Sequence, residues 1–197
     1  MSKIIRASLF GASALALALS FGAVTSPSFA EMADKTVMVG GAEMYPSKNI
    51  VENAVNSKDH TTLVAAVKAE GLVETLKGPG PFTVFAPTNN AFAALLTELG
   101  VSKDALLANK PLLTAVLTYH VLPAKVPASA VPVGKAITTV QGGVFKIESA
   151  GGLKITDGRN RISNITATDI AASNGVIHVI DKVILPADKD IVATAQS

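Results

Sequence analysis

The chain has 197 residues, of which 49% are hydrophobic and 16% are charged, and it contains no cysteine. This composition excludes a chain that is disordered throughout, because enough apolar side chains are present to build a core. The lack of cysteine excludes a disulfide-stapled fold, a thiolate nucleophile and cysteine-ligated zinc or iron–sulfur sites.

The first 30 residues are predicted to be a secretory signal peptide. Lys3 and Arg6 precede an uncharged apolar stretch at residues 7–24, and the small residues Ser28 and Ala30 follow it. This order is typical of export signals and predicts cleavage after Ala30. An uncleaved membrane anchor is the alternative, because such a stretch is almost long enough to span a bilayer. We therefore expect an exported protein, located in the periplasm, on the cell surface or outside the cell.

The predicted mature chain is electrically neutral. Removal of Lys3 and Arg6 reduces the 17 basic residues to 15, which equals the 15 Asp and Glu residues. Such a chain lacks the basic excess that neutralises nucleic-acid phosphates, and it has no cluster of basic residues interleaved with aromatics. Nucleic acid is therefore not an expected partner, and no stable membrane span is expected after cleavage.

The N-terminal half of the mature chain is predicted to be mainly helical. Residues 31–46 show no sustained hydrophobic period and are predicted to be a flexible tail. Apolar residues then recur at helical spacing, interrupted by one short buried strand. The predicted elements are a helix from Lys48, one after an N-cap at Ser57 or Asp59, a turn at residues 72–76, a strand at 82–85, a helix from Thr88 to Leu99, a short helix after Ser102 and a helix from Pro111 to Tyr119.

After Pro123 the hydrophobic period changes from helical to alternating. Short strands are predicted at residues 137–140, 144–148, 153–156, 165–171 and 176–184. Asn174-Gly175 separates the last two and is a dipeptide typical of tight hairpin turns. Helices mainly in the first half and strands mainly in the second predict an α+β domain over residues 47–187, with mostly antiparallel pairing. Residues 188–197 are predicted to be a C-terminal tail.

Three segments resemble the fasciclin-like FAS1 domain family. They are residues 82–92 (Phe-Thr-Val-Phe-Ala-Pro-Thr-Asn-Asn-Ala-Phe), residues 119–123 (Tyr-His-Val-Leu-Pro) and residues 174–186, which begin Asn-Gly-Val-Ile-His. The resemblance implies a β-sandwich or wedge of short strands, with several helices packed on one side, and a secreted or surface-displayed adhesion function. Many relatives carry Asp beside the helix cap, whereas this chain has Asn89 and Asn90, so no role that needs a charge is expected there.

The residues of the first two segments are interpreted as mainly structural. Thr88 is predicted to cap a helix whose first turn is anchored by Phe92; an anion site at that helix start is the alternative. Tyr119 and His120 lie at a helix-to-strand junction and are predicted to be buried. His120 should be neutral and hydrogen-bonded, with Asn89 or Asn90 as a suitable partner. A recognition pair or a general base is the alternative interpretation.

The third segment contains a further histidine and is preceded by a candidate contact. Asn174 and Gly175 are assigned to the turn, and His178 to a strand that is apolar on both faces, as a hydrogen-bonded core residue. In animal relatives, an Asp-Ile pair just before this segment has been proposed as an integrin contact. Asp169 and Ile170 occupy that position and are the candidate adhesion contact, although an Asp at a strand edge also serves solubility.

No catalytic motif is present, and neither a cofactor nor a metal ion is expected. The leading hypothesis is a non-enzymatic binding module for cell adhesion or for surface, extracellular-matrix and biofilm association. It would make weak contacts with an unidentified surface or matrix protein or glycan, through residues 102–110, 123–134 or 157–170. One alternative is a periplasmic carrier of a lipid or small apolar ligand, which needs a cavity of roughly a few hundred Å3. The other is a periplasmic accessory or assembly factor.

Overall fold

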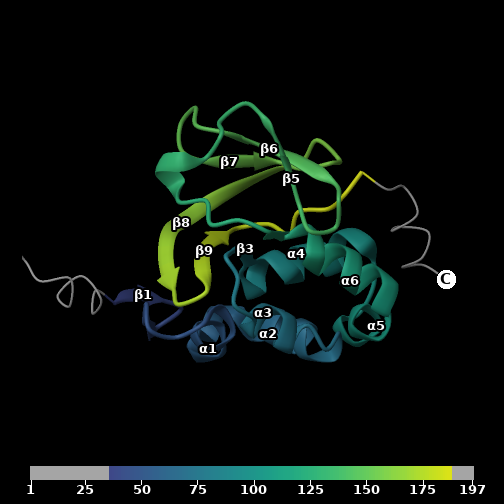
Figure 1. Cartoon of the computed structure of the whole chain (residues 1–197). Helices are drawn as coiled ribbons and strands as arrows, with labels where there is room; N and C mark the ends of the chain where they lie inside the picture. The colour runs from purple at the N-terminus through teal and green to yellow at the C-terminus, as the bar shows by residue number, and fades with distance from the viewer. Residues whose placement is uncertain (1–35, 188–197) are drawn as a thin grey trace, which may run out of the picture.

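The computed structural model describes residues 36–187, which form a layer of helices packed against a bent β-sheet (Figure 1). The predicted signal peptide and the predicted C-terminal tail lie outside the described residues. None of the helices between residues 36 and 187 is long and apolar enough to cross a membrane. The α+β class and the concentration of helices in the N-terminal half are confirmed.

The helices begin and end mostly where local signals place them. Thr88 accepts a hydrogen bond from the Ala91 amide, and Gly100 ends the same helix in a left-handed conformation, as predicted. Ser102 caps the next helix in the same way. The helices are α1 (Ile50–Asn56), α2 (Thr61–Ala69), α3 (Val73–Lys77), α4 (Asn89–Leu99), α5 (Lys103–Ala108) and α6 (Lys110–Tyr119), with 3-10 turns η1 (Lys58–His60) and η2 (Ala128–Ala130).

The main sheet has seven strands in the order β4-β3-β9-β8-β7-β6-β5. Its neighbours pair antiparallel, except that β3 and β9 are parallel. The strands are β3 (Phe82–Pro87), β4 (Val121–Leu122), β5 (Ala136–Thr138), β6 (Val144–Glu148), β7 (Lys154–Thr156), β8 (Ile162–Ala172) and β9 (Gly175–Ile180). The three segments that resemble the FAS1 family therefore meet in space, because they supply or precede the adjacent strands β3, β4 and β9.

The prediction of a flexible tail is wrong for its last part, which forms a β-hairpin. Strands β1 (Val37–Val39) and β2 (Ala42–Met44) pair antiparallel and place Met44 in the core. Gly40 and Gly41 connect them, both with positive φ, as a two-residue hairpin turn of type I′ requires. A side chain on Gly40 would collide with the Ser57 hydroxyl, so the turn also depends on close packing against the start of η1.

The turn between β8 and β9 lies one residue earlier than predicted. Ala172 pairs with Gly175, so the two turn residues are Ser173 and Asn174, and Gly175 begins β9. The glycine is needed at that position because a Cβ there would collide with the Phe82 carbonyl on the neighbouring strand. Gly175 therefore serves close strand packing, and the side chain of Asn174 is available for contacts elsewhere.

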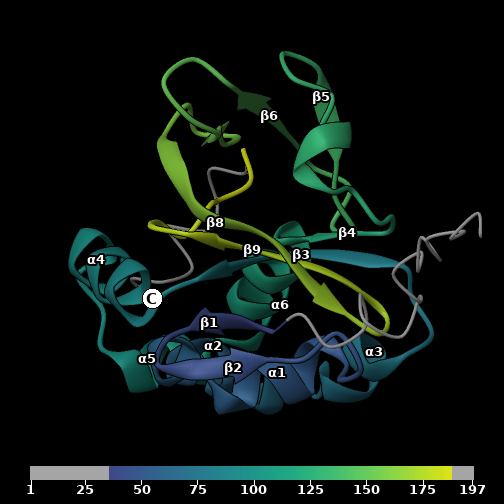
Figure 2. The ribbon, with the colours of Figure 1, turned by 90° about the vertical axis from the view of Figure 1, so that its left-hand side faces the viewer.

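The sheet folds over itself and separates two hydrophobic clusters (Figure 2). The first cluster lies between the helices and one face of the central strands, where Ile177 and Val179 of β9 point. The second includes Phe85 of β3 and Phe145 of β6, whose ring centroids are 5.3 Å apart. Strands β9, β8 and β7 separate β3 from β6 in the sheet, so this contact requires a strong bend. The bend gives the wedge shape.

Candidate functional site

His120 is a buried, neutral hub between helix α6 and the segment after β9. It ends α6 and is only 2% exposed. Its Nε2 accepts a hydrogen bond from the Ile184 amide (3.1 Å), which requires that Nδ1 carry the proton and donate it to the Val116 carbonyl (2.7 Å). Burial lowers the pKa of His120 to about 4. The predicted burial and neutrality of His120 agree with the structure. The prediction that Asn89 or Asn90 is its hydrogen-bond partner is wrong, because the partners are Val116 and Ile184.

Tyr119 anchors the second cluster from the other side of the same junction. Its side chain is fully buried, and its hydroxyl donates to the Val144 carbonyl (2.6 Å) while accepting from the Gly158 amide (2.9 Å). Burial raises the pKa of Tyr119 to about 12, so the phenol keeps its proton. With both side chains saturated by backbone partners, neither Tyr119 nor His120 is placed to act as a general base.

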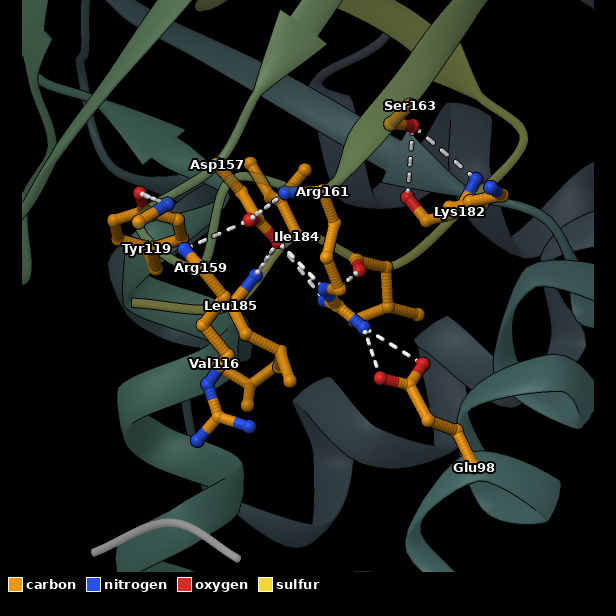
Figure 3. Close-up of polar contacts among 12 residues, drawn as sticks. Glu98, Val116, Tyr119, Asp157, Arg159, Arg161, Ser163, Lys182, Ile184 and Leu185 are labelled. Atoms are coloured by element: carbon orange, nitrogen blue, oxygen red, sulfur yellow. Dashed lines mark hydrogen bonds and ion pairs between the residues drawn. The ribbon is translucent and has the colours of Figure 1, made fainter. Parts of the chain in front are cut away.

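A buried carboxylate that the sequence analysis missed joins three distant segments (Figure 3). Asp157 follows β7, and its side chain is 1% exposed. One oxygen accepts from the Arg159 and Arg161 amides; the other accepts from the Arg161 guanidinium and the Leu185 amide, all at 2.9–3.0 Å. Arg161 also contacts Glu98 of α4 at 2.8 Å. The network holds the turn before β8 against α4 and the segment after β9.

Asn89 caps a helix other than its own. Its Oδ1 accepts from the Thr62 amide (2.9 Å) near the start of α2, and its Nδ2 donates to the Lys58 carbonyl (2.8 Å). Helix α2 has no side-chain cap from its own N-cap residue, so Asn89 supplies the cap that was predicted to come from Ser57 or Asp59. An ionised Asp could not donate to Lys58, which explains why an amide suits this position. Asn90 is exposed.

Asn174 fastens the β8–β9 turn to the helical layer. Its Oδ1 accepts from the Ile50 amide at the start of α1 (3.0 Å). Its Nδ2 donates to the carbonyls of Leu76 (2.7 Å) and Gly78 (3.0 Å) at the end of α3. The side chain is buried and therefore acts as a cross-link between two helix termini and the sheet. Phe92 of α4 is likewise buried, as predicted.

His178 and Asp169 hold the loop of residues 123–134, here called the anchored loop. His178 is 1% exposed; its Nε2 donates to the Val126 carbonyl (2.9 Å), because its Nδ1 accepts from the Asp169 amide (3.3 Å). The Asp169 carboxylate accepts from the Ala128 amide (2.8 Å). Burial lowers the pKa of His178. The prediction of a hydrogen-bonded core histidine is confirmed.

Thr83 is a third anchor of the same loop and was not singled out from the sequence. Its hydroxyl donates to the Ala124 carbonyl (2.6 Å) and accepts from the Val126 amide (2.8 Å). The side chain is fully buried in β3. Thr83 is followed by Val84 and Phe85, a run that is typical of any buried strand. The sequence therefore carries no local signal that Thr83 holds a loop.

The two residues of the candidate adhesion contact lie in different environments. Asp169 is exposed, at φ +57° in an irregular part of β8, and its carboxylate is occupied by the anchored loop. Ile170 is 1% exposed and packs in the first hydrophobic cluster. Ile170 is therefore a core residue, and its assignment as a surface contact is wrong, because a partner could reach it only after local unfolding.

The remaining histidine is also buried. His60 is 3% exposed, and its Nδ1 lies 2.7 Å from the Ser57 hydroxyl. Burial lowers its pKa. Within residues 36–187, no three His, Cys, Asp or Glu residues are grouped so as to hold a metal ion. An apolar void of about 90 Å3 lies under the first three helices; it is smaller than the cavity expected of a lipid carrier.

Comparison with known proteins supports the resemblance seen in the sequence. The family model described as the fasciclin domain matches residues 58–186. The chain is 45% identical over 159 residues to protein sll1483 of Synechocystis, covering 79% of this chain and 83% of that protein. It is 41% identical over 137 residues to the uncharacterized protein sll1735 of the same organism, covering 70% of this chain and 97% of that one.

A solved structure shares the fold. The FAS1 domain pair from the insect cell adhesion molecule fasciclin I superposes with a TM-score of 0.63 and 14% sequence identity. The match covers 81% of this chain and 60% of that chain. At this level of identity the likeness concerns the fold alone.

Proposed function

The chain belongs to the fasciclin domain family, and we propose from this membership that it is an exported, non-catalytic binding module for adhesion. It attaches cells to a surface, an extracellular matrix or a biofilm through weak contacts with a protein or glycan. The family resemblance implies adhesion by secreted or surface-displayed members, which supports this class of function. The periplasm, the cell surface or the extracellular space is the proposed location.

The observation that carries the proposal is the anchored loop. Most of its residues are exposed, including Lys125 and Val133, which is 46% exposed. Beneath it, Thr83, His178 and Asp169 hold the backbone at residues 124–128. A surface loop that is already ordered loses little conformational entropy on binding, so even a small contact area can yield useful affinity.

The polar residues of the three segments that resemble the family support a division between structural residues and contact residues. Tyr119, His120, Asn89 and Asn174 direct their hydrogen bonds to backbone groups inside the domain. Their chemistry therefore serves stability, and ligand contact is left to exposed residues of the anchored loop.

The test compares two equally exposed valines on opposite layers. Val133 lies in the anchored loop, and Val55, which is 50% exposed, lies on α1. Beads coated with the purified mature chain are incubated with cells of the parent organism, and attached beads are counted. We expect Val133→Asp to reduce attachment about fivefold or more, the effect of a contact that contributes ~1 kcal/mol, whereas Val55→Asp should attach like the unaltered protein.

Two results would overturn the proposal. Unchanged attachment of the Val133→Asp beads would remove the anchored loop from the contact. Equal losses with Val133→Asp and Val55→Asp would show that added negative charge, and not the loop, controls attachment. Melting temperatures of both variants show whether each is folded, and both are expected to be close to that of the parent chain because the substituted side chains are exposed.

A further inference from the structure

The apolar void of about 90 Å3 lies where the first three helices cover the sheet. Its walls include Val51 of α1, Val67 of α2, Leu76 of α3, Val84 of β3 and Ile177 of β9. These residues belong to the first hydrophobic cluster, so the inner walls of the void are part of the hydrophobic core. Protein interiors contain few voids larger than a water molecule, which makes this one a feature to explain.

Water is a poor occupant of this void. A buried water needs two to four polar partners, and the walls consist almost entirely of carbon. His120 is a wall residue, but both of its ring nitrogens are already bonded, to the Val116 carbonyl and the Ile184 amide. A hydrocarbon group fits the chemistry of the void. A void of this size holds about three methylene-sized groups, given a share of ~30 Å3 for each water-sized unit.

A cationic depression adjoins the void at the surface. Val51, Lys68 and Val73 line both spaces, and the depression adds Lys48 and Lys77. Three lysine side chains therefore line the depression, and Lys68 also lines the void.

Two carboxylates and a ring also face these lysines. Glu52 lines the depression, but one of its oxygens accepts from the Asn49 amide in the capping box of α1 (2.9 Å). Glu74 lies 3.4 Å from the Lys77 ammonium in an exposed pair. The Lys48 ammonium lies 4.5 Å from the centroid of the Tyr45 ring. Three cations against two carboxylates leave a positive balance at the mouth of the void.

We propose that the void and the depression form one binding site for a single-tailed anionic amphiphile. The end of a straight hydrocarbon tail enters the void, and a carboxylate lies among Lys48, Lys68 and Lys77. A linear tail is favoured over a ring, because the void is smaller than the engineered cavity of ~150 Å3 that binds benzene. None of the residues named at this site belongs to the anchored loop, so this proposal and the proposed adhesive function are tested separately.

Octanoate is the probe, titrated into the isotopically labelled mature chain and followed by methyl NMR. The wall methyls of Val51, Val67 and Ile177 should shift in a saturable manner, whereas Ile147 and Ile155 of the second cluster should not. Octanol, which lacks the charge, and acetate, which lacks the tail, should each bind at least about tenfold more weakly. Equal affinity for octanol and octanoate, or shifts confined to the second cluster, would overturn the proposal.

Two variants separate the tail site from the head-group site. Ala54→Leu adds three carbons to a wall of the void and should weaken octanoate binding about tenfold. The triple change of Lys48, Lys68 and Lys77 to Gln should weaken it by a similar factor and abolish the preference over octanol.

The matched control replaces three exposed lysines outside the depression, Lys103, Lys110 and Lys146, by Gln and should bind octanoate as the parent chain does. Unchanged affinity in both test variants would overturn the proposal. So would binding to phosphatidylglycerol vesicles without any octanoate shifts at the wall methyls, since it would indicate a membrane surface as the ligand. The methyl shifts of the unaltered chain decide the question even if Ala54→Leu does not fold.

Discussion

Replacement of His120 by Gln should make stability less sensitive to acid. In the folded protein, burial lowers the pKa of His120 to about 4, against ~6.5 for an unfolded histidine. The neutral ring is therefore favoured in the folded state. Its contribution to stability is complete above pH ~6.5 and is lost as the pH falls toward about 4, because the unfolded chain takes up a proton that the folded chain refuses.

The magnitude follows from this difference in pKa. Each unit corresponds to 1.36 kcal/mol, so the full loss between neutral pH and pH 4 is about 3 kcal/mol, of which about 2 kcal/mol is already lost at pH 5. Gln does not titrate, and its carbonyl can still accept from the Ile184 amide. The Val116 carbonyl loses its donor, which should destabilise the variant by ~1–3 kcal/mol at pH 7.5.

The assay is urea unfolding of both proteins at pH 7.5 and at pH 5. We expect the free-energy difference between the parent chain and His120→Gln to shrink by about 2 kcal/mol at the lower pH. His60 and His178 also have lowered pKa values, but they are present in both proteins and cancel in the comparison. A difference that is the same at both pH values would refute the reasoning, since it would mean that folded His120 accepts a proton at pH 5.

Other substitutions test the remaining buried contacts by urea unfolding at pH 7.5. Tyr119→Phe keeps the ring but removes the donor to the Val144 carbonyl, while the Gly158 amide keeps its bond to the Leu185 carbonyl, and should lower the free energy of unfolding by ~1–3 kcal/mol. Asp157→Asn removes the buried charge that faces the Arg161 guanidinium, which is 25% exposed and keeps its contact with Glu98, and should cost ~1–3 kcal/mol; a loss under ~0.5 kcal/mol would contradict the network. Asn89→Ala should cost ~1 kcal/mol through the lost cap of α2, whereas Asn90→Ala, at an exposed position, should be neutral within ~0.5 kcal/mol.

The sequence was most informative where the physical cause is local. Helix caps such as Thr88 and Ser102 were predicted correctly because capping depends on residues three positions apart. The hairpin at residues 37–44 could also have been predicted, since Gly40-Gly41 between two short strands is a recognised turn signal.

Partners that come from distant parts of the chain could not be predicted. The sequence predicts that His120 is buried and bonded, and its acceptor Val116 lies one helical turn earlier in α6, but its donor Ile184 is 64 residues away and no spacing rule connects the two. Asp157 bonds locally to Arg159 and Arg161, but its bond to Leu185 forms only after β9 has joined the sheet, and this bond cannot be predicted from the sequence. The burial of Ile170 likewise depends on an irregularity in β8 that turns Asp169 outward, and this follows from pairing with β9.

We infer that the buried polar residues stabilise the domain and do not contact the ligand. The most direct measurement is bead attachment by His120→Gln at a temperature well below its melting point, expressed per folded molecule. Attachment equal to that of the parent chain is predicted, because the anchored loop is intact whenever the domain is folded. A fully folded variant that no longer attaches would contradict this assignment and place His120 in the contact itself.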